Sequence, residues 1–214
     1  MRRWTCVFFS FFFVMFARVA KADNLVQDPG FEIGVSSTYA APMSMGDGWV
    51  VTAGTGAICT SVSGAVCGNA GDAHTGNQMA FLDWDGTTDT ISQTLTTVAG
   101  DTYTISYFVA GTHMNSLTVM FGGTTLFSGF APSAGVDSSE YMEYTFTTTA
   151  TSNSTALAFS STRGLGDAGG EVLLDDVSVT DSSVPEPSSL LLLGTGVVGL
   201  LGTIRRKLQP HWKP

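Results

Sequence analysis

The chain has 214 residues with 18 acidic and nine basic side chains, a formal net charge of −9. The imbalance is concentrated in residues 23–183, which contain 17 acidic residues and one basic residue, Arg163, a charge of −16. Such a segment repels phosphate backbones, so the composition excludes nucleic-acid binding. The acidic surface either attracts divalent cations or keeps the protein in solution.

The first 22 residues have the features of a secretory signal peptide. Arg2 and Arg3 form a positively charged start, residues 6–16 are apolar, and Ala20-Lys21-Ala22 fits a signal-peptidase cleavage site. We therefore expect signal peptidase to remove residues 1–22. Residues 23–183 then form one domain that is long enough for its own hydrophobic core.

Short apolar–polar alternations separated by Gly, Asn, Asp and Ser begin after the signal peptide. The clearest covers residues 101–111, where Tyr103, Ile105, Tyr107 and Val109 share one face. Further strands are predicted at 24–27, 49–52, within 58–66, and at 78–82, 90–96, 116–121, 140–148, 156–160 and 171–180. The fold class is therefore all-β, an antiparallel sandwich or jelly roll. Trp49, at the start of a strand, is expected in its core.

Two cysteines, Cys59 and Cys67, remain in the exported chain. An even pair in an oxidising compartment predicts a disulfide, which contributes about 2–3 kcal/mol of stability. Their spacing matches neither a C-x-x-C redox motif nor a zinc site.

Asp83-Trp84-Asp85 is the candidate glycan-binding segment. A tryptophan face stacks on a sugar ring while flanking carboxylates accept its hydroxyl protons. The competing interpretation is that Trp84 packs in the core or at a strand end.

No catalytic residues are predicted. His74 and His113 stand in turns without the order of a Ser-His-Asp triad or the spacing of a zinc enzyme, and we expect both to be solvated. Asp83 and Asp85 would serve a glycosidase only if they faced each other across a cleft. An extracellular polysaccharide hydrolase therefore stays the alternative function.

Residues 184–207 form a tail with three parts. Pro185-Glu186-Pro187 is expected to be extended and accessible. Residues 188–204 lack charge and predict a transmembrane helix of roughly 25 Å, a marginal span, with a buried helix as the alternative. Arg205, Arg206 and Lys207 are expected to hold its end in the cytoplasm, and residues 208–214 form a short extension.

This order resembles the PEP-CTERM sorting signal of Gram-negative envelope and biofilm proteins. The resemblance implies that an exosortase in the inner membrane cleaves the transiently anchored chain near Pro-Glu-Pro. The ectodomain then reaches the cell surface or the extracellular polysaccharide matrix.

A second resemblance covers nearly the whole ectodomain. The segments 24–32, 91–106 and 174–179 resemble the opening, central and closing strands of galactose-binding-like domains and jelly-roll carbohydrate-binding modules. The resemblance implies a structural calcium between the first and last strands, with Glu32, Asp175 and Asp176 as candidate ligands. Strand alternation predicts that only one of the two aspartates points at the site, and solvated carboxylates are the competing interpretation.

Together these features predict a non-enzymatic, exported matrix protein with a structural or adhesive role, and polysaccharide as its candidate ligand.

Overall fold

The computed structural model describes residues 22–46, 48–60, 71–82, 87–112, 115–133, 135, 137, 140–162, 170–182 and 196. Ala22–Val184 forms one compact unit, which contains every described residue except Gly196. The predicted signal-peptide cleavage region before residue 22, and almost all of the sorting tail, lie outside the described residues. Within the described part of the chain, no helix is long and apolar enough to cross a membrane.

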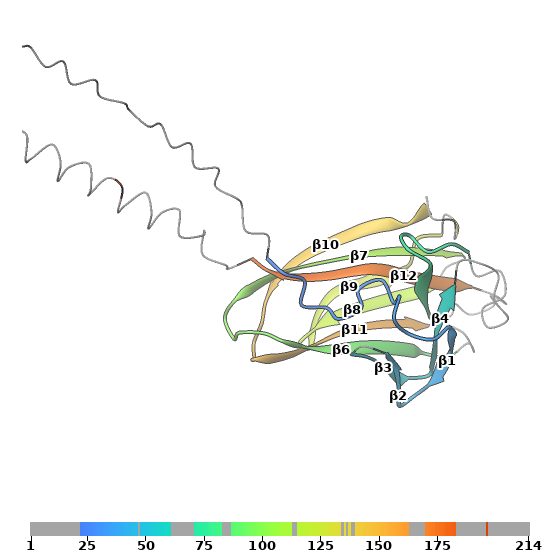
Figure 1. Cartoon of the computed structure of the whole chain (residues 1–214), viewed down its shortest axis with the longest axis horizontal. Helices are drawn as coiled ribbons and strands as arrows, with labels where there is room; N and C mark the ends of the chain where they lie inside the picture. The colour runs from blue at the N-terminus through green and yellow to red at the C-terminus, as the bar shows by residue number, and fades with distance from the viewer. Residues whose placement is uncertain are drawn as a thin grey trace, which may run out of the picture. The chain divides into compact units, whose positions relative to one another are not determined.

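Two six-stranded antiparallel sheets pack face to face (Figure 1). The first sheet has the order β1 (Ser37–Ala40), β4 (Thr55–Thr60), β5 (Gln78–Leu82), β12 (Glu171–Asp181), β7 (Thr102–Thr112) and β10 (Met142–Thr149). The second has the order β2 (Met43–Gly46), β3 (Trp49–Ala53), β6 (Asp89–Thr96), β11 (Ser154–Thr162), β8 (Ser116–Phe121) and β9 (Thr124–Phe130). The predicted all-β sandwich is confirmed.

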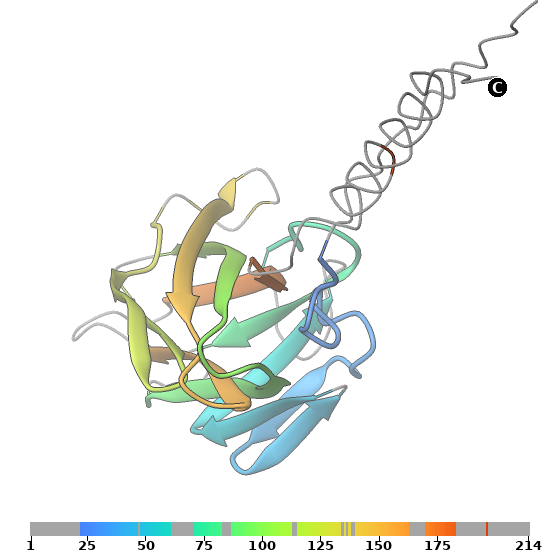
Figure 2. The same cartoon turned by 90° about the vertical axis from the view of Figure 1, so that its left-hand side faces the viewer.

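Period-two alternation explains why these segments form strands. Tyr103, Ile105, Tyr107 and Val109 of β7 are buried, as predicted, while the intervening threonine and serine face outward. The strand predicted at 116–121 is confirmed residue for residue, and the strand predicted within 58–66 is β4, which starts three residues earlier. The view along the strands shows the two layers enclosing one interior (Figure 2).

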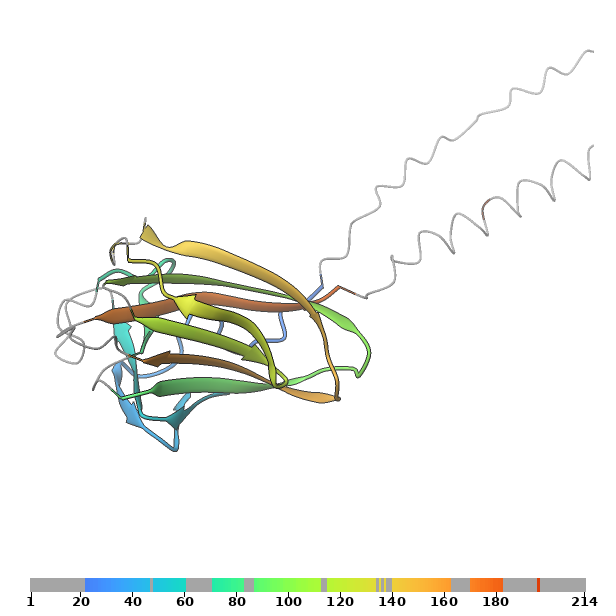
Figure 3. The ribbon, with the colours of Figure 1, turned by 180° about the vertical axis from the view of Figure 1, so that it is seen from behind.

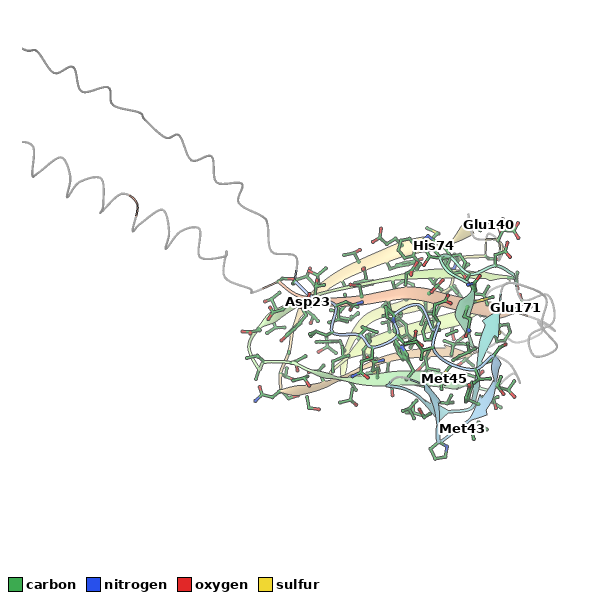
Figure 4. All side chains as sticks on the ribbon, in the orientation of Figure 1. Asp23, Met43, Met45, His74, Glu140 and Glu171 are labelled. Atoms are coloured by element: carbon green, nitrogen blue, oxygen red, sulfur yellow. The ribbon has the colours of Figure 1, made fainter. Side chains whose placement is uncertain are left out.

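The main core fills the space between the sheets. Trp49 is buried there, as predicted, with its ring 5.1 Å from that of Phe31 and 6.2 Å from that of Phe159. Met45 joins this core, whereas Met43, two residues earlier, lies at the outer rim (Figure 4). A second, smaller cluster lies on the outer side of the first sheet and includes Cys59, Phe81 and Leu173.

The segment predicted as a strand at 24–27 is not one. It runs beside β12 and is held by the backbone N–H of Leu25, which donates to the Val179 carbonyl, and by the Asn24 side chain, which bonds Val177 and Val179. Three strands were not predicted: β1, β2 and β9. The first two are only four residues long, and the alternation of β9 is interrupted by Gly129.

Candidate functional site

Three non-glycine residues with positive φ mark one region of the fold. Asp28 has φ 47°, Phe31 has φ 58° and Asp176, at the other end of the domain sequence, has φ 47°. Side chains with a Cβ atom seldom adopt this conformation, and such strain concentrates at functional sites. The region joins the turn 28–32, the segment 74–78 and the middle of β12, and it contains all three predicted calcium ligands.

The turn 28–32 is held by its own first carboxylate. Asp28 Oδ1 accepts the N–H of Glu32 at 2.7 Å and Oδ2 accepts that of Ile33 at 3.2 Å. The Asp28 carbonyl also accepts the Trp49 indole N–H at 3.0 Å. With its backbone fixed in this way, the turn directs Phe31 into the core and leaves Glu32 at the surface.

Asp175 and Asp176 both accept hydrogen bonds from the same residue, Thr75. Asp175 Oδ2 accepts the Thr75 N–H at 3.1 Å, and Asp176 Oδ1 accepts the Thr75 hydroxyl at 2.7 Å. The prediction that only one aspartate would point at the site is therefore wrong. The reason is a bulge in the pairing of β12 with β7 between Asp175 and Ser178, which breaks the alternation of side chains.

Glu32 reaches the same segment from the other side. Its Oε1 accepts the backbone N–H groups of Asn77 at 2.6 Å and Gln78 at 2.9 Å. Gly76, with φ +68°, leaves room for this carboxylate, since a Cβ there would clash with it. A Cβ on Gly30 would lie 3.5 Å from Asp175 Oδ1, 3.7 Å from Glu32 Cγ and 3.8 Å from Asp176 Oδ1. The three predicted ligands therefore surround Gly30.

Asp175 is fully buried, and its ionised form is poorly solvated. Burial raises the pKa of Asp175 to about 7, and the neighbouring Asp176 carboxylate adds to the rise, while N–H groups of Thr75, Asp176 and His74 oppose it. A bound cation would favour the ionised form.

His74 closes the outer side of the site. Its ring stacks on Phe108 with centroids 3.8 Å apart, and its Nδ1 lies 2.6 Å from Asp176 Oδ2. The expectation that His74 is solvated is therefore wrong, because the β12 bulge supplies a carboxylate that the sequence did not place beside it. Tyr141 also contacts His74, donates to the Asp72 carbonyl at 3.0 Å, and has its pKa raised by burial and by the three nearby aspartates. His113 lies outside the described residues.

A metal centre does not follow from these contacts alone. No group of three His, Cys, Asp or Glu side chains in the described ranges is arranged to hold a metal ion. Five of the six carboxylate oxygens of Glu32, Asp175 and Asp176 already contact protein groups, either hydrogen-bond donors or His74 Nδ1. Calcium requires six to eight oxygens, so its binding here stays a prediction.

The candidate glycan segment, Asp83-Trp84-Asp85, lies outside the described residues, but the strand before it, β5, and the neighbouring strand ends are described. β5 ends at Leu82, opposite Val172 near the start of β12, and β7 ends at Thr112, opposite Glu171. At this end of the sandwich the Asn115 side chain is buried, and among the described residues neither its oxygen nor its nitrogen has a hydrogen-bond partner. Cys59 is buried in the smaller cluster, and since Cys67 is not described, the disulfide stays a prediction.

Comparison with known families identifies the tail. The PEP-CTERM protein-sorting motif matches residues 183–207, which include Pro185, Glu186, Pro187 and the basic residues Arg205, Arg206 and Lys207. The chain therefore carries a sorting signal that implies export, membrane anchoring and exosortase processing. None of the curated proteins compared with the chain matches it.

Several solved carbohydrate-binding modules are similar to the ectodomain. TmCBM61, solved with β-1,4-galactotriose, has 18% identity and a TM-score of 0.50, over 75% of this chain and all of that one. CBM35 from Paenibacillus barcinonensis has 20% identity and a TM-score of 0.43, over 68% and 99%. The CBM22-1 xylan-binding domain of Xyn10C from the same source has 16% identity and a TM-score of 0.40, over 72% and 98%. The first likeness establishes the jelly-roll fold.

Proposed function

We propose that this protein is an exported, exosortase-sorted component of the cell envelope or biofilm matrix whose jelly-roll domain binds extracellular polysaccharide without cleaving it. The observation that carries the proposal is the pairing of a PEP-CTERM sorting signal with a fold similar to that of a carbohydrate-binding module solved with β-1,4-galactotriose. The signal supports delivery to the outside of the cell, and the fold supports a binding role there.

The acidic surface of the domain restricts which polysaccharides it can bind. Residues 23–183 contain 17 acidic residues and one basic residue. A uronate-rich or sulfated chain would be repelled by this surface unless a cation bridged the two. The ligand is therefore a neutral polysaccharide, and hydrogen bonds to its hydroxyl groups and stacking on its sugar rings supply the affinity.

The test uses the purified domain and the polysaccharide of the producing cell. The domain is passed over the immobilised neutral fraction and, separately, over the anionic fraction, and the supernatant is assayed for new reducing ends. Retention on the neutral fraction without release of reducing ends supports the proposal. Release of reducing ends would instead establish the hydrolase, and retention on neither fraction would refute glycan binding.

A further inference from the structure

The four strands at the edges of the two sheets differ in how well they are protected from pairing with another chain. β1 and β2 have four residues each, and β2 has a register shift in its pairing with β3. The pairing of β9 with β8 is interrupted by a register shift between Val119 and Met120. Short strands and bulges are the usual means of blunting a sheet edge. Three of the four edges carry such a feature.

β10 is the exception. It has eight residues, contains neither proline nor lysine, and pairs with β7 through eight consecutive residues without a shift. In the described part of the first sheet it is the last strand, and the view from behind shows no strand beyond it (Figure 3). A long, regular edge of this kind is a template for another strand.

The backbone groups on the free side of β10 can be assigned by alternation. Just beyond β10, the Ala150 N–H donates to the carbonyl of Asp101, which directly precedes β7. The next residue, Thr102, points the other way, because its carbonyl accepts the N–H of Ser182, on the side of β7 where β12 lies. Antiparallel pairing alternates between the two sides of a strand. The N–H and C=O groups of Glu143, Thr145, Thr147 and Thr149 therefore point away from β7, and all four side chains are exposed.

We propose that β10 pairs antiparallel with β10 of a second copy of this chain, about a two-fold axis at Phe146. In this register Thr145 lies opposite Thr147 of the other copy, and Glu143 lies opposite Thr149. All four free residues are paired, and the only charge on the strand meets a threonine. Although each domain carries a charge of −16, the strands that meet contain one charged residue per copy, Glu143, and this register keeps the two Glu143 side chains from lying opposite each other.

Half-buried aromatic side chains next to this edge favour the same pairing. Tyr144 and Phe146 of β10 face the seam between the two sheets, where their ring centroids lie 5.1 Å and 6.5 Å from that of Phe127 on β9. In the dimer Phe146 meets its own copy at the axis, and Tyr144 is covered by Thr148 of the other copy. The pairing therefore removes apolar surface from water as well as adding hydrogen bonds.

Sedimentation of the purified Ala22–Val184 unit, which contains both sheets and the core, tests the proposal. We expect a concentration-dependent monomer–dimer equilibrium. Thr147→Pro removes one donor from each copy, hence two hydrogen bonds, and is expected to weaken association about tenfold or more. Thr145→Lys is a second variant, which keeps the backbone N–H in place and should also weaken association. Thr94→Lys, on the exposed face of the interior strand β6, adds the same charge as a control and should dimerise normally.

Amide hydrogen exchange tests the proposed register of the two β10 strands. In the dimer the N–H groups of Thr145 and Thr147 should exchange more slowly as protein concentration rises, and this protection should vanish in Thr145→Lys. A unit that stays monomeric at all concentrations would overturn the proposal. So would a dimer in which both β10 variants associate as tightly as the unmodified unit, or in which these two amides remain unprotected.

Discussion

The Thr75 hydroxyl donates a 2.7 Å hydrogen bond to the Asp176 carboxylate, and the two residues are 101 positions apart in the chain. This contact exists because Asp176 occupies a β-bulge with positive φ. Together with Asp175 and Glu32 it fastens the segment 74–78 to β12 and to the N-terminal turn. Glu32, Asp175 and Asp176, here called the carboxylate clasp, therefore stabilise the fold by joining these three segments, with or without a bound cation.

Asp176→Ala is expected to lower the free energy of unfolding by about 2 kcal/mol, because it removes the acceptor for Thr75 and forces alanine into positive φ. Asp176→Asn should cost less, since asparagine retains an acceptor oxygen and tolerates that conformation. Urea denaturation measures both. Asp23→Ala removes the same charge from an exposed position and should leave stability within about 0.5 kcal/mol. Equal losses for all three variants would contradict the clasp.

Gly76→Ala should destabilise the fold more than Gly123→Ala. Both glycines have positive φ, at +68° and +84°, so each substitution costs roughly 1–2 kcal/mol of backbone strain. Only at Gly76 does the new Cβ meet Glu32 Oε1, which would break the bonds to Asn77 and Gln78. Thermal melts of the two variants compare these costs directly, and a Gly123→Ala variant as unstable as Gly76→Ala would refute the role of Glu32.

Stability in the presence of chelator should fall as pH rises from about 4 toward 7 through the contribution of Asp175. Its folded-state pKa of about 7 lies above the ordinary value, so the folded protein binds more protons than the unfolded chain in this window. Through this group the free energy of unfolding changes by at most roughly 1.4 kcal/mol per pH unit. Asp175→Asn should remove that dependence on pH, so the stability of the variant relative to the unmodified protein should rise as pH rises from about 4 toward 7. Identical pH profiles for the two proteins would show that Asp175 does not titrate in this range.

Calcium, if it binds between Glu32, Asp175 and Asp176, should raise the melting temperature, and chelation should reverse the rise. Glu32→Gln should weaken the response by removing one ligand charge. Calorimetry with calcium and with chelator provides the measurement, and Asp23→Ala, which leaves the cluster intact, is the control. A melting temperature that calcium leaves unchanged would end the calcium prediction.

The core of the sandwich was predictable because its strands alternate regularly. The burial of Tyr103, Ile105, Tyr107 and Val109 follows from period two, and that of Trp49 from a strand start after Gly48. The clasp was only partly predictable. The sequence identified Glu32, Asp175 and Asp176, but a bulge that turns two consecutive aspartates toward one threonine arises from pairing with β7. The same bulge brings Asp176 to His74, which no local pattern around that histidine indicates.

The most direct test of the proposed function is the mass and location of the ectodomain-tagged protein in two otherwise identical hosts, with and without an exosortase. The sorting signal predicts loss of the tail and release of the ectodomain only in the host that has the enzyme. Changing Pro185 and Pro187 to alanine should leave the tail uncleaved there. An uncleaved product that stays in the inner membrane of both hosts would contradict exosortase sorting and, with it, the delivery of this domain to the matrix.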